Sequence, residues 1–292
     1  MKQSPAVWLV SLESTPLELR PFPMPDSARS LDEISAALPA GAYTTLRTYR
    51  GEKALRLADH FQRLEQTASL AKRPIKLDQN VLRRFLRQSI HLYRSERRQQ
   101  EDVSDLRIRL TLDLEVRPGD LYLAIQPLPP IPQEYYLHGV QAITCDLQRL
   151  LPEAKLTRFI DRSQHIRRLL TDGLNEAILV DNQGRLLEGL SSNFFAVLQG
   201  ELRTAGEGVL AGITRSLTLE CANKQHIPVR LEAVHRSALP ELEEAFITSS
   251  SRGILPIRQL DEIEIGVECP GLLTRRLMQD FEEAIEEQIE SI

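Results

Sequence analysis

Short apolar runs separated by polar turns occur along most of the chain, and this pattern predicts a protein that contains both strands and helices. Runs rich in Val, Ile, Leu and Phe between Gly, Pro, Asn and Asp residues are typical of strands. The expected strands are 6–11, 42–49, 54–57, 106–114, 121–126, 140–145, 177–180, 185–187, 193–198, 229–233, 245–248 and 254–257. The segment 177–198 has Asn and Gly turns between its runs, which indicates an antiparallel meander.

Apolar residues at helical spacing predict several helices between these strands. Leu64 and Ala68 lie four residues apart after Asp59, which is a suitable N-cap. The other expected helices are 81–94, about 158–171, 214–223 and a long acidic segment after Gly271.

A proline-rich segment divides the chain. The sequence from 127 to 132 reads PLPPIP, and proline both lacks an amide hydrogen and fixes φ. We therefore expect an N-terminal α/β domain at 1–126, a linker at 127–134 and a C-terminal domain at 135–292. A length of 292 residues agrees with two domains.

Composition excludes several classes of protein. The net charge of −5 argues against a nucleic-acid-binding protein, which normally carries a basic excess. Cys145, Cys221 and Cys269 lack CxxC spacing, so neither a disulfide framework nor a metal site is expected. No apolar run reaches the roughly 18 to 20 residues that a membrane span needs. We expect a soluble cytoplasmic protein without a nucleic-acid, membrane or metal partner.

Two residues stand out for their chemistry. Lys155 follows the strand 140–145 and begins a segment expected to be helical. Most lysines are exposed cations, but a lysine with a lowered pKa can form a Schiff base with a carbonyl compound. Glu188 lies at the end of one strand of the meander and is followed by small polar residues before the next. Loops of this kind often carry binding groups.

Three further features suit a phosphorylated ligand. Ile213 and Thr214 open a helix after Gly212, where backbone N–H groups bind anions. Ser250 follows the strand 245–248, and Arg63 supplies a positive charge on a helix. Taken singly, a plain helix start, a polar loop and a surface arginine are simpler interpretations.

Together these residues form an ordered set of motifs. They are RTYRG at 47–51, HFQRL at 60–64, the run 173–195 around Glu188, LAGITR at 210–215 and TSSS at 248–251. The set resembles the class IV aminotransferases, the fold type IV pyridoxal phosphate enzymes, over residues 40 to 280. This family includes branched-chain and D-amino acid aminotransferases and aminodeoxychorismate lyase.

The resemblance implies a fold and a cofactor. The fold would be α+β, with a smaller N-terminal α/β domain and a larger, β-rich pseudo-barrel domain that binds pyridoxal 5′-phosphate. Lys155 would bind the cofactor covalently and later move the Cα proton, and Glu188, 33 residues further on, would face the pyridine nitrogen. The residues implied for the phosphate are Arg63, Ile213, Thr214 and Ser250.

The resemblance also implies a substrate class and an assembly. An amino acid and a 2-oxo acid would bind near Arg47, Arg109 and Ser251, in a homodimer. Two positions depart from the family pattern: Arg158 and Phe159 stand where full-pattern transaminases have an asparagine, and Thr44 replaces a glutamate. These departures leave the cofactor chemistry unchanged but argue against a standard branched-chain substrate. The chain length and the short segment around the lysine more closely resemble aminodeoxychorismate lyase and the D-amino acid aminotransferases.

Three functions are therefore compared. The leading hypothesis is an aminotransferase acting between an amino acid and a 2-oxo acid. The alternative is aminodeoxychorismate lyase, which releases 4-aminobenzoate and pyruvate, and the third is a non-catalytic homologue on the same scaffold.

Overall fold

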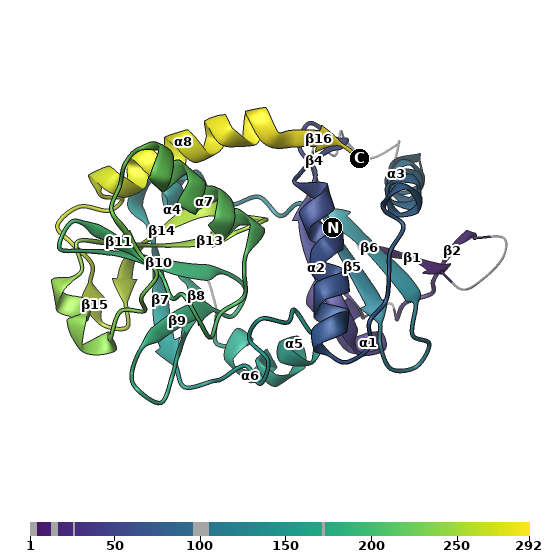
Figure 1. Ribbon diagram of the computed structural model, residues 1–292, viewed down its shortest axis with the longest axis horizontal. Helices are drawn as coiled ribbons and strands as arrows, with labels where there is room; N and C mark the ends of the chain where they lie inside the picture. Colours follow the sequence, from purple (N-terminus) through teal and green to yellow (C-terminus); the bar gives the residue numbers. More distant parts are fainter. Residues whose placement is uncertain (1–4, 13–16, 26, 96–104, 171–172) are drawn as a thin grey trace. The chain divides into compact units, whose positions relative to one another are not determined.

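The computed structural model describes residues 5–12, 17–25, 27–95, 105–170 and 173–292, which form two compact units (Figure 1). The first contains the described residues up to Pro129 together with 154–162 and 288–292. The second contains 130–153 and 163–287. The chain passes from the first unit to the second after Pro129, and the segment around Lys155 packs with the first unit.

The first unit is built on an antiparallel sheet with the strand order β2-β1-β6-β5-β3. Its strands are β1 (Ala6–Ser11), β2 (Leu19–Pro21), β3 (Gly41–Arg47), β5 (Leu106–Asp113) and β6 (Asp120–Pro127). Its helices are α1 (Leu31–Ala37), α2 (Leu57–Leu70), α3 (Gln79–Ser95) and α5 (Arg158–Arg162). A small second sheet pairs β4 (Lys53–Leu55) with β16 (Ile289–Ser291).

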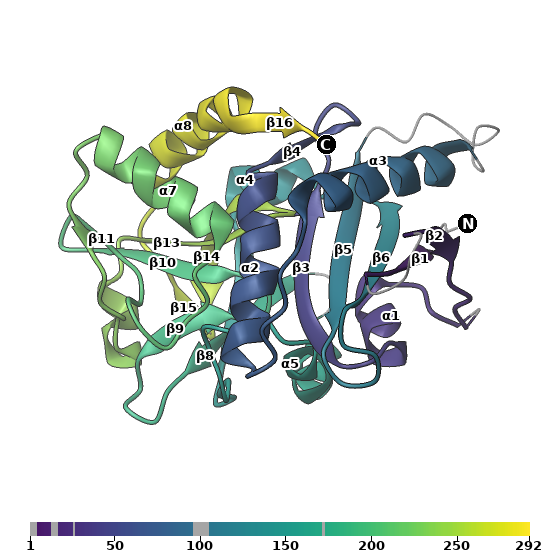
Figure 2. The same cartoon turned by 45° about the vertical axis from the view of Figure 1, so that its right-hand side comes forward.

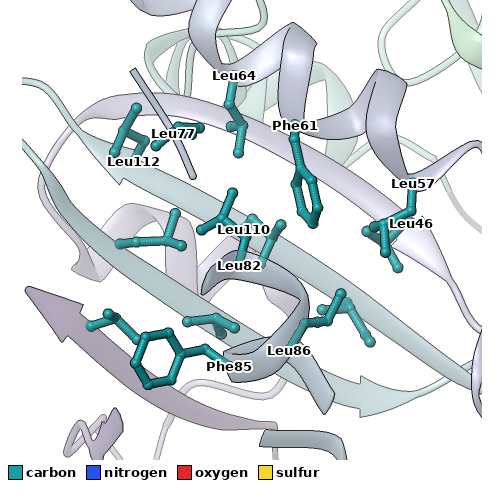
Figure 3. Packing of buried hydrophobic residues seen from close by; sticks show 14 of the residues in the cluster. Leu46, Leu57, Phe61, Leu64, Leu77, Leu82, Phe85, Leu86, Leu110 and Leu112 are labelled. Atoms are coloured by element: carbon teal, nitrogen blue, oxygen red, sulfur yellow. The ribbon is translucent and has the colours of Figure 1, made fainter. Parts of the chain in front are cut away.

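Helices α2 and α3 cover one face of the main sheet (Figure 2). Alternate residues of β5 point to this face, and Leu110 and Leu112 are buried beneath Phe61 of α2 and Leu82 of α3 (Figure 3). The opposite face carries a smaller apolar cluster, in which Val7 and Leu9 contact α1. Period-two alternation along β5 therefore separates an apolar face from one that holds polar side chains.

The second unit contains a closed ring of strands (Figure 1). Its strands are β7 (Val140–Cys145), β8 (Leu174–Val180), β9 (Leu186–Gly189), β10 (Asn193–Leu198), β11 (Glu201–Arg203), β12 (Val229–Arg230), β13 (Glu244–Ser249), β14 (Gly253–Leu260) and β15 (Ile263–Glu264). The pairing runs β10-β13-β14-β7-β8-β9, and β9 then pairs with β10 through Glu188 and Asn193. Closure removes the unpaired edges that an open sheet would present.

Five helices belong to the described part of this unit, and the core of the barrel-like sheet is mostly aliphatic. The helices are α4 (Gln133–His138), α6 (Gln164–Arg167), α7 (Ile213–Lys224), α8 (Leu272–Gln288) and a 3-10 helix at Arg236–Glu241. Ile178 of β8, Phe194 of β10 and Ile247 of β13 meet in one buried cluster. The mixed helix and strand content with a barrel-like second unit confirms the expected fold class.

Some local expectations were wrong. The single helix expected at about 158–171 is two short helices, α5 and α6, separated at Ser163, and residue 171 lies outside the described residues. Lys155 is extended rather than helical. Asp59 lies inside the first turn of α2, whose N-cap position is Arg56 at φ 48°. The pattern also gave no sign of α1 or β16.

Among the described residues, no helix combines the length and the apolar character needed to cross a bilayer.

Replacing Leu64 with alanine should destabilise the first unit. Its side chain is fully buried under α2, so the cavity left behind should lower the free energy of unfolding by about 2–5 kcal/mol. Leu70, which is 44% exposed on the same helix, provides the control, and Leu70→Ala should change stability by about 0.5 kcal/mol or less. Trp8 is the single tryptophan and lies in the same core, so its fluorescence during denaturant unfolding reports this unit. Equal losses in both variants would contradict the packing described.

Candidate functional site

Lys155 is held against the outermost strand of the first sheet. Its carbonyl accepts a hydrogen bond from the Tyr43 amide (2.9 Å), and Thr157 N–H donates to the Gly41 carbonyl (3.0 Å). The Lys155 amide donates to Thr67 Oγ1 on α2 (3.2 Å). The Nζ atom lies 4.8 Å from the centre of the Tyr43 ring, within cation–π range. Backbone hydrogen bonds on both sides therefore fix the position from which the lysine side chain extends.

Arg63 lies on α2, buried with only neutral hydrogen-bond partners. Its Nη2 donates to Thr44 Oγ1 (2.6 Å) and lies 3.2 Å from His60 Nδ1. Its Nε is buried without a hydrogen-bond partner, and no carboxylate of the described residues forms an ion pair with it. Burial lowers the pKa of Arg63 to about 10, while Tyr43 and Asp59 oppose this shift. The guanidinium is thus a buried cation at neutral pH that lacks an anion.

His60 completes this cluster as a neutral base. Thr44 Oγ1 lies 2.7 Å from His60 Nδ1, and the same hydroxyl accepts a hydrogen bond from Arg63. Burial lowers the pKa of His60 well below its usual value, and the charges of Arg63 and Lys155 lower it further. The structure therefore brings Arg63, His60 and Lys155 together within the first unit.

The departure at Thr44 has a local effect here. Thr44 offers a hydroxyl where a glutamate would place a carboxylate beside Arg63. The charge of Arg63 consequently stays available for a bound anion. At the other departure, the Arg158 side chain is largely exposed and pairs with Glu115.

Glu188 carries a buried carboxylate and lies where β9 pairs with β10 to close the ring of strands. Its Oε1 lies 2.8 Å from Arg149 Nε, and both side chains are buried. Its Oε2 accepts hydrogen bonds from Asn193 Nδ2 (3.2 Å) and from the Leu210 amide (3.1 Å). Charge-assisted donors of this kind stabilise an ionised carboxylate and fix its orientation.

The start of α7 lies beside this carboxylate. Asn193 Nδ2 also donates to the Leu210 carbonyl (2.9 Å), two residues before Gly212. A Cβ atom on Gly212 would collide with Asn193 Oδ1, so only glycine allows this close approach. Gly212 is the N-cap of α7, and no side-chain oxygen caps the first turn, so the amides of Ile213 and Thr214 lie at an uncapped helix start.

Ser250 and Ser251 lie in the turn that joins β13 to β14, where both are partly exposed. Arg252 stabilises this turn, since its Nε donates to Ser249 Oγ (3.1 Å). The second unit thus contains both Glu188 with the α7 start and the serine turn, while Lys155 and Arg63 belong to the first unit.

The two arginines expected to bind substrate both have acidic partners. Arg47 pairs with Asp105 (3.1 Å) and lies over the Tyr49 ring. Arg109 is almost completely buried, and its Nη1 contacts Asp32 Oδ1, Ser35 Oγ and the Leu31 carbonyl, each at 2.8 Å. Arg109 therefore holds α1 to the sheet, and a substrate carboxylate would compete with Asp32 for it.

Sequence reasoning missed three residues of these clusters. His60 was visible only as part of the HFQRL motif, and Thr67 and Arg149 belong to no motif. Their roles depend on which residues the fold places beside Lys155 and Glu188, and sequence spacing does not reveal that. No group of three or more His, Cys, Asp or Glu side chains suited to a metal ion occurs in the described part of the chain.

Comparison with known proteins identifies relatives of this arrangement. The sequence profile of the family "Amino-transferase class IV" matches residues 41–260. A Thermotoga maritima protein described as a branched-chain-amino-acid aminotransferase is 28% identical over 267 residues, which cover 87% of this chain and 92% of that protein.

Solved structures have the same fold. The crystal structure of a Thermotoga maritima protein assigned to the branched-chain amino acid aminotransferases aligns with a TM-score of 0.73 at 26% identity, covering 97% of this chain and 96% of the other. A hypothetical aminotransferase from Mycobacterium tuberculosis, in its PLP-bound form, gives 0.74 at 21% identity, with 96% and 99% covered. At that lower identity the match supports the fold alone.

The buried neutral His60 should make the first unit less stable in mild acid. Unfolding exposes an imidazole that takes up a proton below about pH 6.5, so the free energy of unfolding should fall as the pH falls from 7.5 to 5.5. His60→Gln should remove up to about 1.4 kcal/mol per pH unit of this dependence below pH 6.5. Denaturant unfolding followed by Trp8 fluorescence measures the effect.

His91→Gln is the control for this measurement, because His91 is exposed on α3 of the same unit. It should keep the pH dependence of the unmodified protein. The same dependence in His60→Gln would show that His60 does not carry it.

Proposed function

The chain belongs to the amino-transferase class IV family and is an aminotransferase, and we propose that it uses pyridoxal 5′-phosphate bound by the residues described above. The observation that carries this assignment is Arg63, a buried guanidinium without an anion, in the cluster that also contains Lys155. The cofactor, when bound, supplies an electron sink for the carbanion formed at the substrate Cα.

Lys155 is the proposed catalytic base and covalent attachment point. The hydrogen bonds to Tyr43, Gly41 and Thr67 hold the backbone on either side of Lys155 in place. A side chain that extends from a fixed backbone position can place its amine at the same reacting atom in each turnover. Its Nζ would take the Cα proton from the amino acid and return a proton when the amino group passes to the 2-oxo acid.

The cofactor phosphate is assigned to four residues. Arg63 would supply a positive charge. Ile213 and Thr214 would supply the first-turn amides of α7, and Thr214 and Ser250 would each supply a hydroxyl. Cations and helix N-termini are the groups that proteins use for phosphate, which supports the assignment.

Glu188 is assigned to the pyridine nitrogen. A carboxylate at this nitrogen favours its protonated form, which withdraws electrons more strongly from the reacting carbon. Arg149, Asn193 and the Leu210 amide support the role, because their contacts fix the orientation of the Glu188 carboxylate. For the substrate carboxylate, Arg47, Arg109 and the Ser251 backbone remain the proposed contacts.

We further propose a branched-chain amino acid as the donor, against the expectation from Arg158 and Thr44, because the relative that shares 28% identity is described by that activity. A homodimer is proposed from the family resemblance. A cytoplasmic location is supported by the three cysteines, which are all free thiols.

Replacing Lys155 should abolish cofactor attachment. Purified protein should show the visible absorption band of lysine-bound pyridoxal phosphate. Lys155→Ala should lose this band, and its rate of amino transfer should fall by about a thousandfold or more. Lys76→Ala is the matched control, because its side chain is 93% exposed in the same unit, and it should retain both. A colourless wild-type protein that takes up no added cofactor would rule the proposal out.

A donor and acceptor screen should identify the reaction. With 2-oxoglutarate as acceptor, branched-chain L-amino acids should be turned over with kcat/KM at least about tenfold above D-alanine, a difference of about 1.4 kcal/mol in transition-state binding. Product 2-oxo acids are quantified by mass spectrometry. Aminodeoxychorismate is tested in parallel, and release of 4-aminobenzoate and pyruvate without keto-acid-dependent transfer would instead identify a lyase. Cofactor binding without turnover over the panel would identify a non-catalytic homologue.

A further inference from the structure

We propose that Glu176 is a positioning residue that holds the Ser249–Arg252 turn and the Gly189–Asn193 turn in one fixed arrangement. This inference rests on the proposed function, because the first turn contains Ser250 and Ser251 and the second directly follows Glu188. Glu176 itself is not assigned to contact cofactor or substrate.

A single carboxylate oxygen of Glu176 joins the two turns. Glu176 lies on β8 and is 1% exposed. Its Oε2 accepts hydrogen bonds from Arg252 Nη2 (2.6 Å), Ser192 Oγ (2.8 Å) and Ser191 Oγ (2.9 Å). Arg252 comes from the first turn and the two serines from the second, so both turns share one acceptor.

Arg252 extends this connection through its other nitrogens. Nη2 also donates to Ser191 Oγ (2.9 Å), Nε to Ser249 Oγ (3.1 Å) and Nη1 to the Asn175 carbonyl (3.3 Å). The Arg252 carbonyl accepts from Tyr136 Oη (2.9 Å). A planar guanidinium with this many fixed donors leaves the turn around Ser250 and Ser251 little freedom.

The second turn is packed just as closely. A Cβ atom on Gly189 would collide with Ser192 Oγ and with the Glu176 side chain. The Gly189 amide donates to the Ser192 carbonyl (2.8 Å), which closes the turn directly after Glu188. The orientation of the Glu188 backbone therefore depends on the position of the Glu176 carboxylate.

Glu176 is ionised in this environment. Burial opposes its ionisation, but the charge and hydrogen bonds of Arg252, the Ser192 hydroxyl and the charge of Arg167 outweigh burial and lower the pKa of Glu176. A glutamine of the same shape could keep an oxygen acceptor at the Oε2 position, but it would lose the ion pair with Arg252. Its NH2 group would then face the Ala177 amide, which donates to Oε1 (3.3 Å).

Glu176→Gln should therefore weaken cofactor binding. Titration of the apo-protein with pyridoxal phosphate, followed by calorimetry, should show at least a tenfold higher Kd. Ser192→Ala removes one neutral donor and keeps the ion pair, so it should fold and raise the Kd about twofold to fivefold. A Kd unchanged in both variants would overturn the inference.

A mutant cycle separates coupling from general damage. If Glu176 acts through Arg252, the double variant Glu176→Gln/Arg252→Gln should bind no more weakly than the weaker single variant. Multiplicative losses would show that the two side chains act independently, and the inference would fail. Asp181→Asn, which disrupts the pair with Arg185 at the other end of β8, is the control and should leave the Kd unchanged.

Hydrogen exchange of the apo-protein tests the inference without the cofactor. Amides of both turns should exchange at least about tenfold faster in Glu176→Gln, whereas Asp181→Asn should leave them unchanged. If wild-type protein binds no pyridoxal phosphate but the exchange result holds, the proposed function fails and the structural coupling stands. Unchanged exchange in Glu176→Gln overturns the coupling whatever the cofactor does.

Discussion

The second unit depends on a single residue pair that closes its ring of strands. Asn193 pairs with Glu188 between β10 and β9, and the same asparagine side chain donates to Glu188 and to the chain that leads into α7. Barrel closure, orientation of a buried carboxylate and placement of a helix start are therefore one constraint. This constraint requires glycine at positions 212 and 189, since a larger residue would collide with the side chains that maintain this packing.

The first unit solves a different problem, which is to keep an amine and a buried cation close together. Arg63 and Lys155 would repel each other without a ligand, and the groups beside them are uncharged. His60 stays uncharged, Thr44 contributes a hydroxyl, and the Tyr43 ring faces the ammonium group. The buried charge of Arg63, which has no ion pair among the described residues, is a cost to folding that a bound anion would offset.

Much of this could be predicted from the sequence, because strand periodicity is strong where one face is buried. The strand at Val140–Cys145 and the helix start at Ile213 follow directly from local pattern. The break at Ser163 and the extended backbone of Lys155 could not be predicted, since pairing with β3, far away in sequence, overrides local helical preference. Arg149 and Glu176 are likewise identified only by tertiary contacts. Lys155 was selected by its spacing from Glu188, and its role at the cofactor stays a prediction.

The segment around Lys155 also has a consequence for solubility. Strand β3 ends its sheet, and residues 155–157 occupy the amide and carbonyl groups that this edge would otherwise expose. In the sequence, this segment lies between residues of the second unit, although it packs in the first. A fragment that ends at Pro129 would lack it and would leave the edge of β3 uncovered. An uncovered strand edge pairs readily with copies of itself. The stretch that presents the amine is therefore also the part of the chain that protects the first sheet from aggregation.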